Sequence, residues 1–327
     1  MSFFLKNADD GKLLVAQNFT ENDFAVSGYQ TNTYNVEFSF GNTQTTQWNI
    51  DGICISYTEA KFNKPALLDW NGDAEMITLY FNLQGKMSIA DISDIISIEL
   101  YSNQHNIIYS SEAKGQLKVD ELRMRSFMVQ LSKSAFSRVS SNVGGELKHF
   151  ADTVVKGEPA VFSAINLPVD FEIQNCINQI IYCPYGDELK PMFLYSKVIE
   201  LLVLQAASYK RSQQTTVRVI KTEYDYERII FARDYLLKNI EVPPSLAELS
   251  HIAGINEFKL KKGFRETFNQ SVFQYLSNHR LETAKIHLLE GSKSPTELAF
   301  ELGYSSLQHF SSAFKKKFGM PPKQVRQ

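Results

Sequence analysis

The sequence is poor in the residues and patterns that define several classes of protein. Its 327 residues include three cysteines, Cys54, Cys176 and Cys183, and no C-x-x-C pair. A disulfide framework or a structural zinc site needs more thiols at closer spacing, so we expect neither, and such low cysteine usage fits a reducing cytosol. No run of about 18 apolar residues occurs, which argues against a membrane-spanning helix. The start, MSFFLKNADDGK, lacks the layout of a secretory signal, so we expect a cytoplasmic protein.

Catalytic signatures are missing as well. The sequence contains no G-x-S-x-G, P-loop or G-x-G-x-x-G motif, so hydrolases, nucleoside triphosphatases and dinucleotide-dependent enzymes have no support. A metal-dependent enzyme in the N-terminal half would need two or three histidines and a carboxylate. That region offers His105, which we place on a surface loop, and His149 just beyond it. We therefore expect a protein that is not an enzyme and has no cofactor or metal.

The first 130 or so residues have the pattern of a β domain. Short runs rich in β-branched and aromatic residues alternate with turn signals such as Gly41-Asn42 and Asn103-Gln104. Many short strands at such spacing predict a β-sandwich or a cupin-like barrel, within an α+β chain of several domains. The expected strands are 12–16, 34–40, 53–57, 76–83, 95–101, 107–109 and 124–131.

From about residue 134 the pattern becomes helical, most clearly over 190–211. Positions 194, 198, 201, 202 and 205 of this stretch fall on one helix face, which is mainly apolar. The face either packs on the β domain or packs against its copy in a homodimer, and both interpretations remain open. The dimer interpretation assigns dimerisation to Leu194, Val198, Leu201 and Leu202.

These changes of pattern divide the chain into parts. We expect a β-rich effector or regulatory domain at 1–133, a helical segment at 134–213, a linker at 214–223 and a helical domain at 224–327. The net charge is −2, yet the last third is mildly basic, which favours a polyanionic partner.

The most informative feature is an internal repeat in the last hundred residues. One copy begins at Ser245 and the other at Ser294, 49 positions later. In both, Ser is followed three residues later by Glu, which is the capping box of a helix start. A glycine, Gly254 or Gly303, then ends the short helix, where a left-handed residue is usually needed. A second helix follows with a stripe of buried residues at steps of four, Leu260, Phe264 and Phe268 in one copy and Phe310, Phe314 and Phe318 in the other.

A helix, a short glycine turn and a second helix form the helix-turn-helix plan. Stretch 272–289 predicts one continuous helix between the copies, 224–239 predicts a leading helix, and 321–326 a short final one, giving an all-α unit of seven helices. The joining helix would span about 27 Å, close to the ~34 Å repeat of major-groove faces. One chain could then read two adjacent grooves. The alternative is a helical-repeat module for protein interaction, fused to a small-molecule sensor.

The second helix of each copy would carry the residues that contact DNA. Lysine and arginine reach guanine or phosphate, glutamine pairs with adenine, and an aromatic ring packs on the thymine methyl group. His309 would be partly buried or face a phosphate, without a metal role. The outward positions are Phe258, Lys259, Lys261, Lys262 and Arg265 in the first reader, and Gln308, Ser311, Ser312, Lys315, Lys316 and Lys317 in the second.

Over about residues 224–327 the sequence resembles the AraC/XylS family of bacterial transcription regulators. The resemblance implies sequence-specific binding of double-stranded DNA, activation through RNA polymerase, and an N-terminal domain that binds a small effector and often dimerises. It is carried by 245–268, Arg280-Leu281, Ala284, Ala299, Gly303-Tyr304, Phe310, Phe314, Phe318-Gly319 and Pro321-Pro322.

By position in the family's motif, the base-contacting residues correspond to Phe258, Lys261 and Lys262 in the first reader. In the second they correspond to Leu307, Gln308, Ser311 and Ser312, where the family frequently has Arg and this chain has Ser312.

A finer resemblance concerns the effector. Stretches 256–268 and 190–205 are similar to regulators that respond to ferric siderophores such as pyochelin, and 52–57 and 77–85 fit that group loosely. A siderophore is therefore one candidate effector. The function expected from the sequence is that of an effector-responsive transcription activator.

Overall fold

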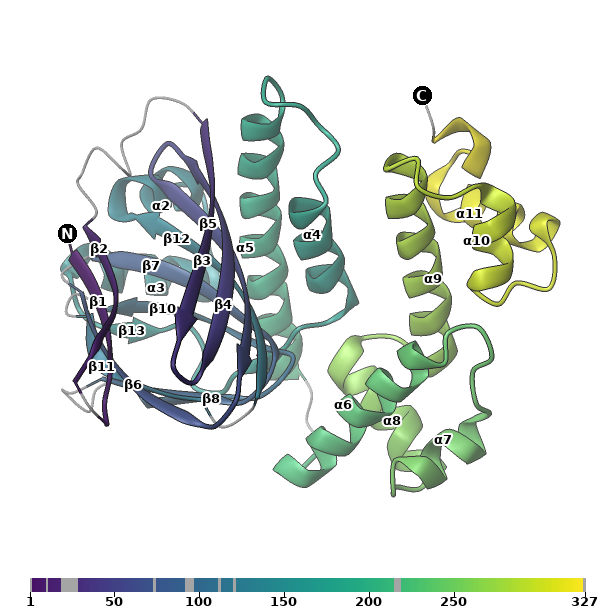
Figure 1. Ribbon diagram of the computed structural model, residues 1–327, viewed down its shortest axis with the longest axis horizontal. Helices are drawn as coiled ribbons and strands as arrows, with labels where there is room; N and C mark the ends of the chain where they lie inside the picture. The colour runs from purple at the N-terminus through teal and green to yellow at the C-terminus, as the bar shows by residue number, and fades with distance from the viewer. Residues whose placement is uncertain are drawn as a thin grey trace. The chain divides into compact units, whose positions relative to one another are not determined.

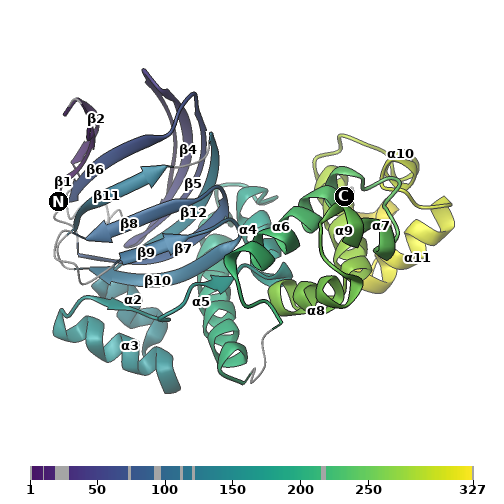
Figure 2. The same cartoon turned by 90° about the horizontal axis from the view of Figure 1, so that it is seen from below.

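The computed structural model describes residues 2–9, 11–18, 29–72, 75–91, 97–110, 113–119, 122–214 and 219–325. The chain forms two compact units, one made of 1–169 with 185–214 and the other of 170–184 with 215–327. Figures 1 and 2 draw both units from two directions. Among the described residues, no helix combines the length and hydropathy that a membrane span requires.

The N-terminal unit contains two antiparallel sheets. Its strands are β1 (Ser2–Asn7), β2 (Leu13–Asn18), β3 (Tyr29–Phe38), β4 (Gly41–Ile50), β5 (Ile53–Phe62), β6 (Ala66–Gly72), β7 (Met76–Gln84), β8 (Met87–Asp91), β9 (Ser97–Leu100), β10 (Gln104–Ser110), β11 (Ala113–Val119), β12 (Arg123–Ser132), β13 (Ala160–Val161) and β14 (Leu167–Pro168). An eight-stranded sheet has the order β13-β10-β7-β12-β5-β4-β3, with β14 also paired to β10, and a six-stranded sheet has the order β2-β1-β6-β11-β8-β9. The expected β region is therefore present.

An apolar cluster joins the two sheets. Its buried side chains come from both sheets and from the turn between β3 and β4, and include Phe62 and Tyr80 from one sheet and Leu68 and Leu100 from the other. Helices α2 (Lys133–Ser140), α3 (Gly145–Lys156) and α5 (Lys190–Gln214) lie along the other face of the eight-stranded sheet (Figure 2). Residues on that face, such as Leu79 and Val129, are fully buried.

Strand β4 is one of the strands that the apolar runs did not predict. Its sequence, GNTQTTQWNI, places hydroxyl and amide side chains on both faces for most of its length. Even so it pairs along its whole length with β3 and β5. The backbone ladder and the flanking strands therefore define this strand, and a search for apolar runs overlooks it.

Helix α5 is longer than expected and ends at Gln214. Leu194, Val198, Leu201 and Leu202, the residues assigned to dimerisation, are at most 3% exposed within the single chain. This placement favours the interpretation in which the stripe packs on the β domain. Of the expected linker, 215–218 lie outside the described residues, and the next helix begins at Glu223.

The surface position expected for His105 is wrong. His105 lies in β10 and is 1% exposed, with its Nδ1 atom 3.1 Å from Nε2 of Gln205 in α5. Its ring packs beside Phe81. Burial, and to a smaller extent the positive charge of Arg211, lower the pKa of His105 from 6.5 to about 3. The imidazole is therefore neutral inside the fold.

This burial predicts a pH dependence. An unfolded histidine takes up a proton near pH 6.5 and the folded one only near pH 3, so the unfolded state binds more protons between these values. We expect the free energy of unfolding of the N-terminal unit to fall as the pH falls from 6.5 towards 3. The slope should be smaller in His105→Gln. Denaturation followed by fluorescence of Trp48 and Trp70, both in this unit, measures it.

The exposed His149 provides the control, since His149→Gln should keep the wild-type slope. Identical slopes for wild type and His105→Gln would contradict the lowered pKa of the buried His105.

Candidate nucleic-acid interface

The C-terminal unit is helical over its described residues. Its elements are α4 (Phe171–Ile181), α6 (Glu223–Lys238), α7 (Leu246–Ile252), α8 (Glu257–Phe268), α9 (Val272–Leu289), α10 (Pro295–Glu301), α11 (Leu307–Phe318) and the short 3-10 helix η1 (Pro322–Gln324). The tandem arrangement expected from the repeat is confirmed: α7 with α8 and α10 with α11 form two hairpins, and α9 runs between them in both views (Figures 1 and 2).

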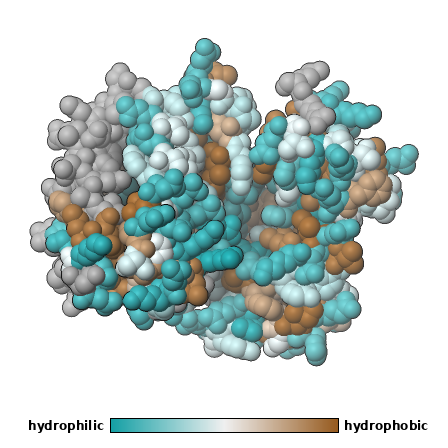
Figure 3. Space-filling view, in the orientation of Figure 1, coloured by the Kyte–Doolittle hydropathy of each residue, from teal (hydrophilic) through white to brown (hydrophobic). Residues whose placement is uncertain are grey.

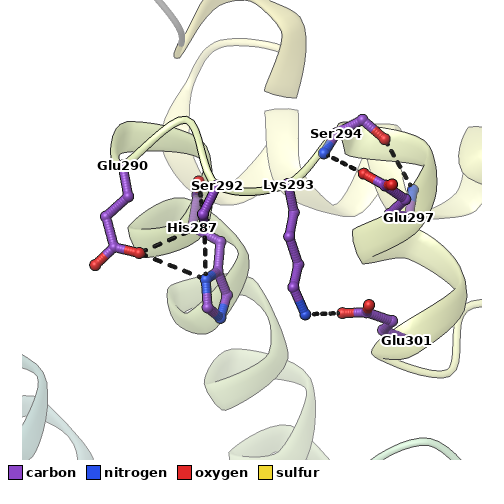
Figure 4. Close-up of polar contacts among 7 residues, drawn as sticks. All are labelled: His287, Glu290, Ser292, Lys293, Ser294, Glu297 and Glu301. Carbon is purple, nitrogen blue, oxygen red and sulfur yellow. Dashed lines mark hydrogen bonds and ion pairs between the residues drawn. The ribbon is translucent and has the colours of Figure 1, made fainter.

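Both hairpins begin with the expected capping box. The hydroxyl of Ser245 accepts from the backbone N–H of Glu248 at 3.2 Å, and the Glu248 carboxylate accepts from the Ser245 N–H at 2.8 Å. The distances for Ser294 and Glu297 are 3.3 and 2.7 Å (Figure 4). Each pair satisfies two backbone donors that the first helical turn leaves without a partner.

Further polar contacts hold the approach to the second hairpin. His287 Nδ1 lies 3.1 Å from Ser292 Oγ at the end of α9, and Lys293 forms an ion pair with Glu301 in α10 (Figure 4). These contacts lie at the two ends of the short connection between α9 and α10.

The stripes of the repeat are buried as expected. Leu260, Phe264 and Phe268 are 0% exposed, and so are Phe310 and Phe314, while Phe318 is partly buried against the second core. The centroid of the Tyr275 ring in α9 lies 5.7 and 4.9 Å from those of Phe264 and Phe268. Helix α8 therefore rests directly on α9.

A helix from an earlier part of the chain completes this core. Phe171, the first residue of α4, is buried with its ring centroid 5.7 Å from that of Tyr275. The Lys317 ammonium of α11 lies 4.8 Å from the centre of the Phe171 ring. Segment 170–184 thus belongs to the same compact unit as the two hairpins.

The first reader helix, α8, presents part of the expected surface. Phe258 is 63% exposed, and Lys262 and Arg265 are exposed with no side-chain partner among the described residues. Lys261 is exposed too, but its ammonium lies 2.9 Å from a carboxylate oxygen of Glu257 one turn earlier. These four side chains make an outward face that is cationic and aromatic, which suits phosphate and base edges.

Lys259 does not share this face. Its Nζ lies 2.7 Å from Oδ1 of the buried Asp225 in the first turn of α6. The hydrogen bond from Lys259 holds the pKa of Asp225 below its ordinary value. The lysine therefore joins α8 to α6, and no local sequence pattern reveals this pair because its partners are 34 residues apart.

The second reader helix, α11, is exposed at Gln308, Ser312, Lys315 and Lys316, and Ser311 is half-buried. His309, expected to be partly buried or to face a phosphate, is exposed with Nδ1 2.8 Å from Ser305 Oγ.

Two other residues of this helix point inward. Leu307 packs against the second apolar core. Lys317, expected with its neighbours at the DNA backbone, has its Nζ 2.9 Å from Glu282 and donates to Asn278, so it joins α11 to α9. Figure 3 shows hydrophilic residues over much of the face in view, with apolar residues between them.

The two turn glycines adopt the expected left-handed conformation, with φ of 69° at Gly254 and 72° at Gly303. Their surroundings differ. A Cβ on Gly254 would meet only the Tyr224 hydroxyl, at 3.8 Å. A Cβ on Gly303 would lie 2.1 Å from the carbonyl oxygen of Glu241 and 2.6 Å from a guanidinium nitrogen of Arg280. Only the second turn has no room for a side chain.

Two hairpins on one helix, each with an exposed polar second helix, define a tandem helix-turn-helix protein. Residues 249–327 match a family model described as a helix-turn-helix domain, and 44–220, more than half of the chain, match the N-terminal domain of regulatory protein PchR. The chain belongs to the AraC family of helix-turn-helix transcriptional regulators with a PchR-type N-terminal domain. This is a family of regulators rather than of enzymes.

Several known proteins are similar to parts of the chain. Regulatory protein PchR of Pseudomonas aeruginosa is 34% identical over 128 residues, 39% of this chain and 42% of that protein. The HTH-type transcriptional regulator ArgR of the same species is 33% identical over 88 residues, 27% of each chain. The chain thus covers less than half the length of these relatives. The crystal structure of an AraC-type regulator from Chromobacterium violaceum is 27% identical, covers 31% of this chain and 89% of that one, and has a TM-score of 0.29.

The unequal glycines predict unequal costs of adding a methyl group. Gly254→Ala should lower the free energy of unfolding by about 1–2 kcal/mol, because only the left-handed conformation is penalised. Gly303→Ala should lower the free energy of unfolding by about 1–3 kcal/mol more than Gly254→Ala, because the methyl group also displaces packed backbone. Thermal melting of the full chain, followed by helical circular dichroism, compares the two. Equal melting temperatures would contradict the close approach at Gly303.

Proposed function

We propose that the protein is a sequence-specific transcription regulator that reads two adjacent major grooves with α8 and α11. The supporting observation is the pair of capped hairpins on α9, each with exposed polar or cationic residues on its second helix. The matches to helix-turn-helix regulators support the same function. We keep 224–327 as the DNA-binding domain, 214–223 as its linker, 134–213 as the helical segment and 1–133 as the regulatory domain.

The proposed contacts follow the exposure of the side chains. Lys259 and Leu307 are occupied by other parts of the fold, and we assign them a supporting role. The residues proposed to face DNA are Phe258, Lys261, Lys262, Arg265, Gln308, Ser311, Ser312, Lys315 and Lys316.

The regulatory role is proposed for the N-terminal unit. On the inner face of the eight-stranded sheet the apolar cluster gives way to hydroxyls, where Thr45 and Thr58 are hydrogen-bonded at 2.9 Å and Ser56 is buried. Two sheets enclosing such a mixed surface, in the manner of a cupin-like barrel, would suit a small effector with polar and apolar parts. A siderophore is a candidate, and activation through contact with RNA polymerase is the expected outcome.

Binding to DNA is tested first by its salt dependence. If several lysines and arginines contact phosphates, log Kd should rise linearly with log salt concentration, with a slope of roughly 0.9 for each phosphate contacted.

Lys262→Ala or Arg265→Ala should weaken binding by about 1–3 kcal/mol if the contact is to a base. A lost phosphate contact should instead lower the salt slope by about one. Fluorescence anisotropy with duplexes selected from a random-sequence library measures both.

The control removes a lysine elsewhere. Lys148 lies in α3 of the N-terminal unit and is exposed, so Lys148→Ala should bind as wild type does. If no duplex is enriched at low salt, the alternative of a protein-interaction module is favoured. Unchanged affinity in both reader variants would remove α8 from the interface.

A homodimer is part of the proposal, but through another face of α5. Met192, Ile199 and Val203 are 74%, 37% and 59% exposed, and with Ser196 and Ala206 they are spaced alternately by three and four residues. Such spacing is the seam of a coiled coil, and a second copy of the same helix would cover it.

The dimer proposal predicts that Val203→Glu separates the subunits, because a buried charge in the seam has no partner. Sedimentation of the full chain over a range of concentrations measures the effect. Val155→Glu, at a 73% exposed position of α3, is the matched control and should stay dimeric. A monomeric wild type would contradict the homodimer. A dimeric Val203→Glu would show that the dimer interface is not this face of α5.

A further inference from the structure

The second hairpin is linked to the first through α9 and also through the loop that precedes α7. The loop between α6 and α7 contains Ile240 and Glu241, and the side chain of Ile240 packs against both apolar cores of the C-terminal unit. The backbone of Gly303, in the turn of the second hairpin, comes so close to the Glu241 carbonyl that a Cβ would lie 2.1 Å from its oxygen. The second hairpin therefore leans on the loop that leads into the first.

One side chain of α9, that of Arg280, contacts both the loop before α7 and the turn of the second hairpin. Arg280 Nε donates to the carbonyl oxygen of Ile240 at 3.1 Å, and Nη2 donates to the same oxygen and to that of Glu241. The guanidinium carbon lies 5.7 Å from the centre of the Tyr304 ring, next to Gly303. That ring contacts Phe310 of α11 at a centroid distance of 5.3 Å.

A rod alone cannot fix the geometry of two readers. Helix α9 sets the distance between the hairpins and each hairpin packs on it through its own apolar core, but a small tilt or rotation within that packing would still turn one reader relative to the other. A second set of contacts away from the helix axis removes that freedom. On DNA a rotation of one reader about the duplex corresponds to a shift in base pairs, since the helix repeats every ~10.5 base pairs.

We propose that Arg280 is a positioning residue that sets the spacing and helical phase of the two DNA segments read by α8 and α11. This inference rests on the proposed function, because it requires that both helices read DNA. Arg280 itself need not touch the duplex, since its guanidinium is directed at the two carbonyls and the ring.

The chemistry of the clamp calls for arginine. A planar guanidinium offers several donors in a fixed fork and can stack on an aromatic ring while it binds neighbouring carbonyls. A lysine at this position keeps the charge and much of the length, but its ammonium lacks the fork and the flat face. Arg280→Lys should therefore fold and leave the hairpins less firmly oriented.

The test uses the full chain and a duplex selected by wild type from a random-sequence library. Footprinting locates its two contacted segments, and base pairs are then inserted or removed between them. Wild type should lose affinity by roughly ten-fold or more when the spacing changes by about half a turn, ~5 base pairs. In Arg280→Lys this penalty should shrink to within about three-fold, with a broader optimum.

Two further variants separate positioning from stability. Gln274→Ala changes an exposed residue of the same helix and should keep the wild-type spacing profile. Tyr304→Leu removes the stacking partner and should broaden the profile as Arg280→Lys does.

The outcomes are distinct. If wild type selects no duplex, the proposed function fails. If wild type binds with a sharp optimum and Arg280→Lys keeps that optimum, or loses affinity equally at every spacing, the positioning role fails while DNA binding stands. A flat profile for wild type would overturn the positioning role as well.

Discussion

The arrangement of the helical unit depends on one close backbone approach, that of Gly303 to the carbonyl of Glu241. A left-handed φ of 72° at this residue turns the chain from α10 into α11, and the missing side chain lets the turn rest on the loop ahead of α7. Both apolar cores meet at Ile240 beside it. The capping boxes, the aromatic stripes and α9 build each hairpin, and this contact joins the second hairpin to the loop that leads into the first.

Charge in this unit serves two purposes that depend on burial. Lys259 and Lys317 are paired with Asp225 and Glu282 and join neighbouring helices, where a lost partner would leave a charge in a poorly solvated place. Lys262 and Arg265 are exposed to solvent on α8, where a polyanion can contact them. Neighbouring cationic residues in one helix thus divide between holding the fold and offering a surface, and the direction of each side chain makes the difference.

The extent to which the sequence predicted the structure follows the range of the interactions. Capping boxes, turn glycines and stripes at steps of four are local patterns, so the sequence alone predicts both hairpins. The sequence wrongly predicts Lys259 at the DNA surface and His105 on a loop, because their partners Asp225 and Gln205 lie 34 and 100 residues away and no local pattern points to them. Strand β4 was missed because its side chains are mostly polar and its place depends on the strands beside it. A single sequence does not show which residues are buried by segments far away in the chain.

The segment 170–184 has a consequence for protein engineering. It is flanked on both sides by residues of the N-terminal unit, yet Phe171 fills a place beside Tyr275 among the helices of the other unit. A chimaera spliced at the linker would therefore separate this ring from the aromatic residues it covers. Exchanging sensor halves between related regulators requires either that the recipient supplies an equivalent aromatic residue, or that α4 and its contact surface on α9 are transplanted together.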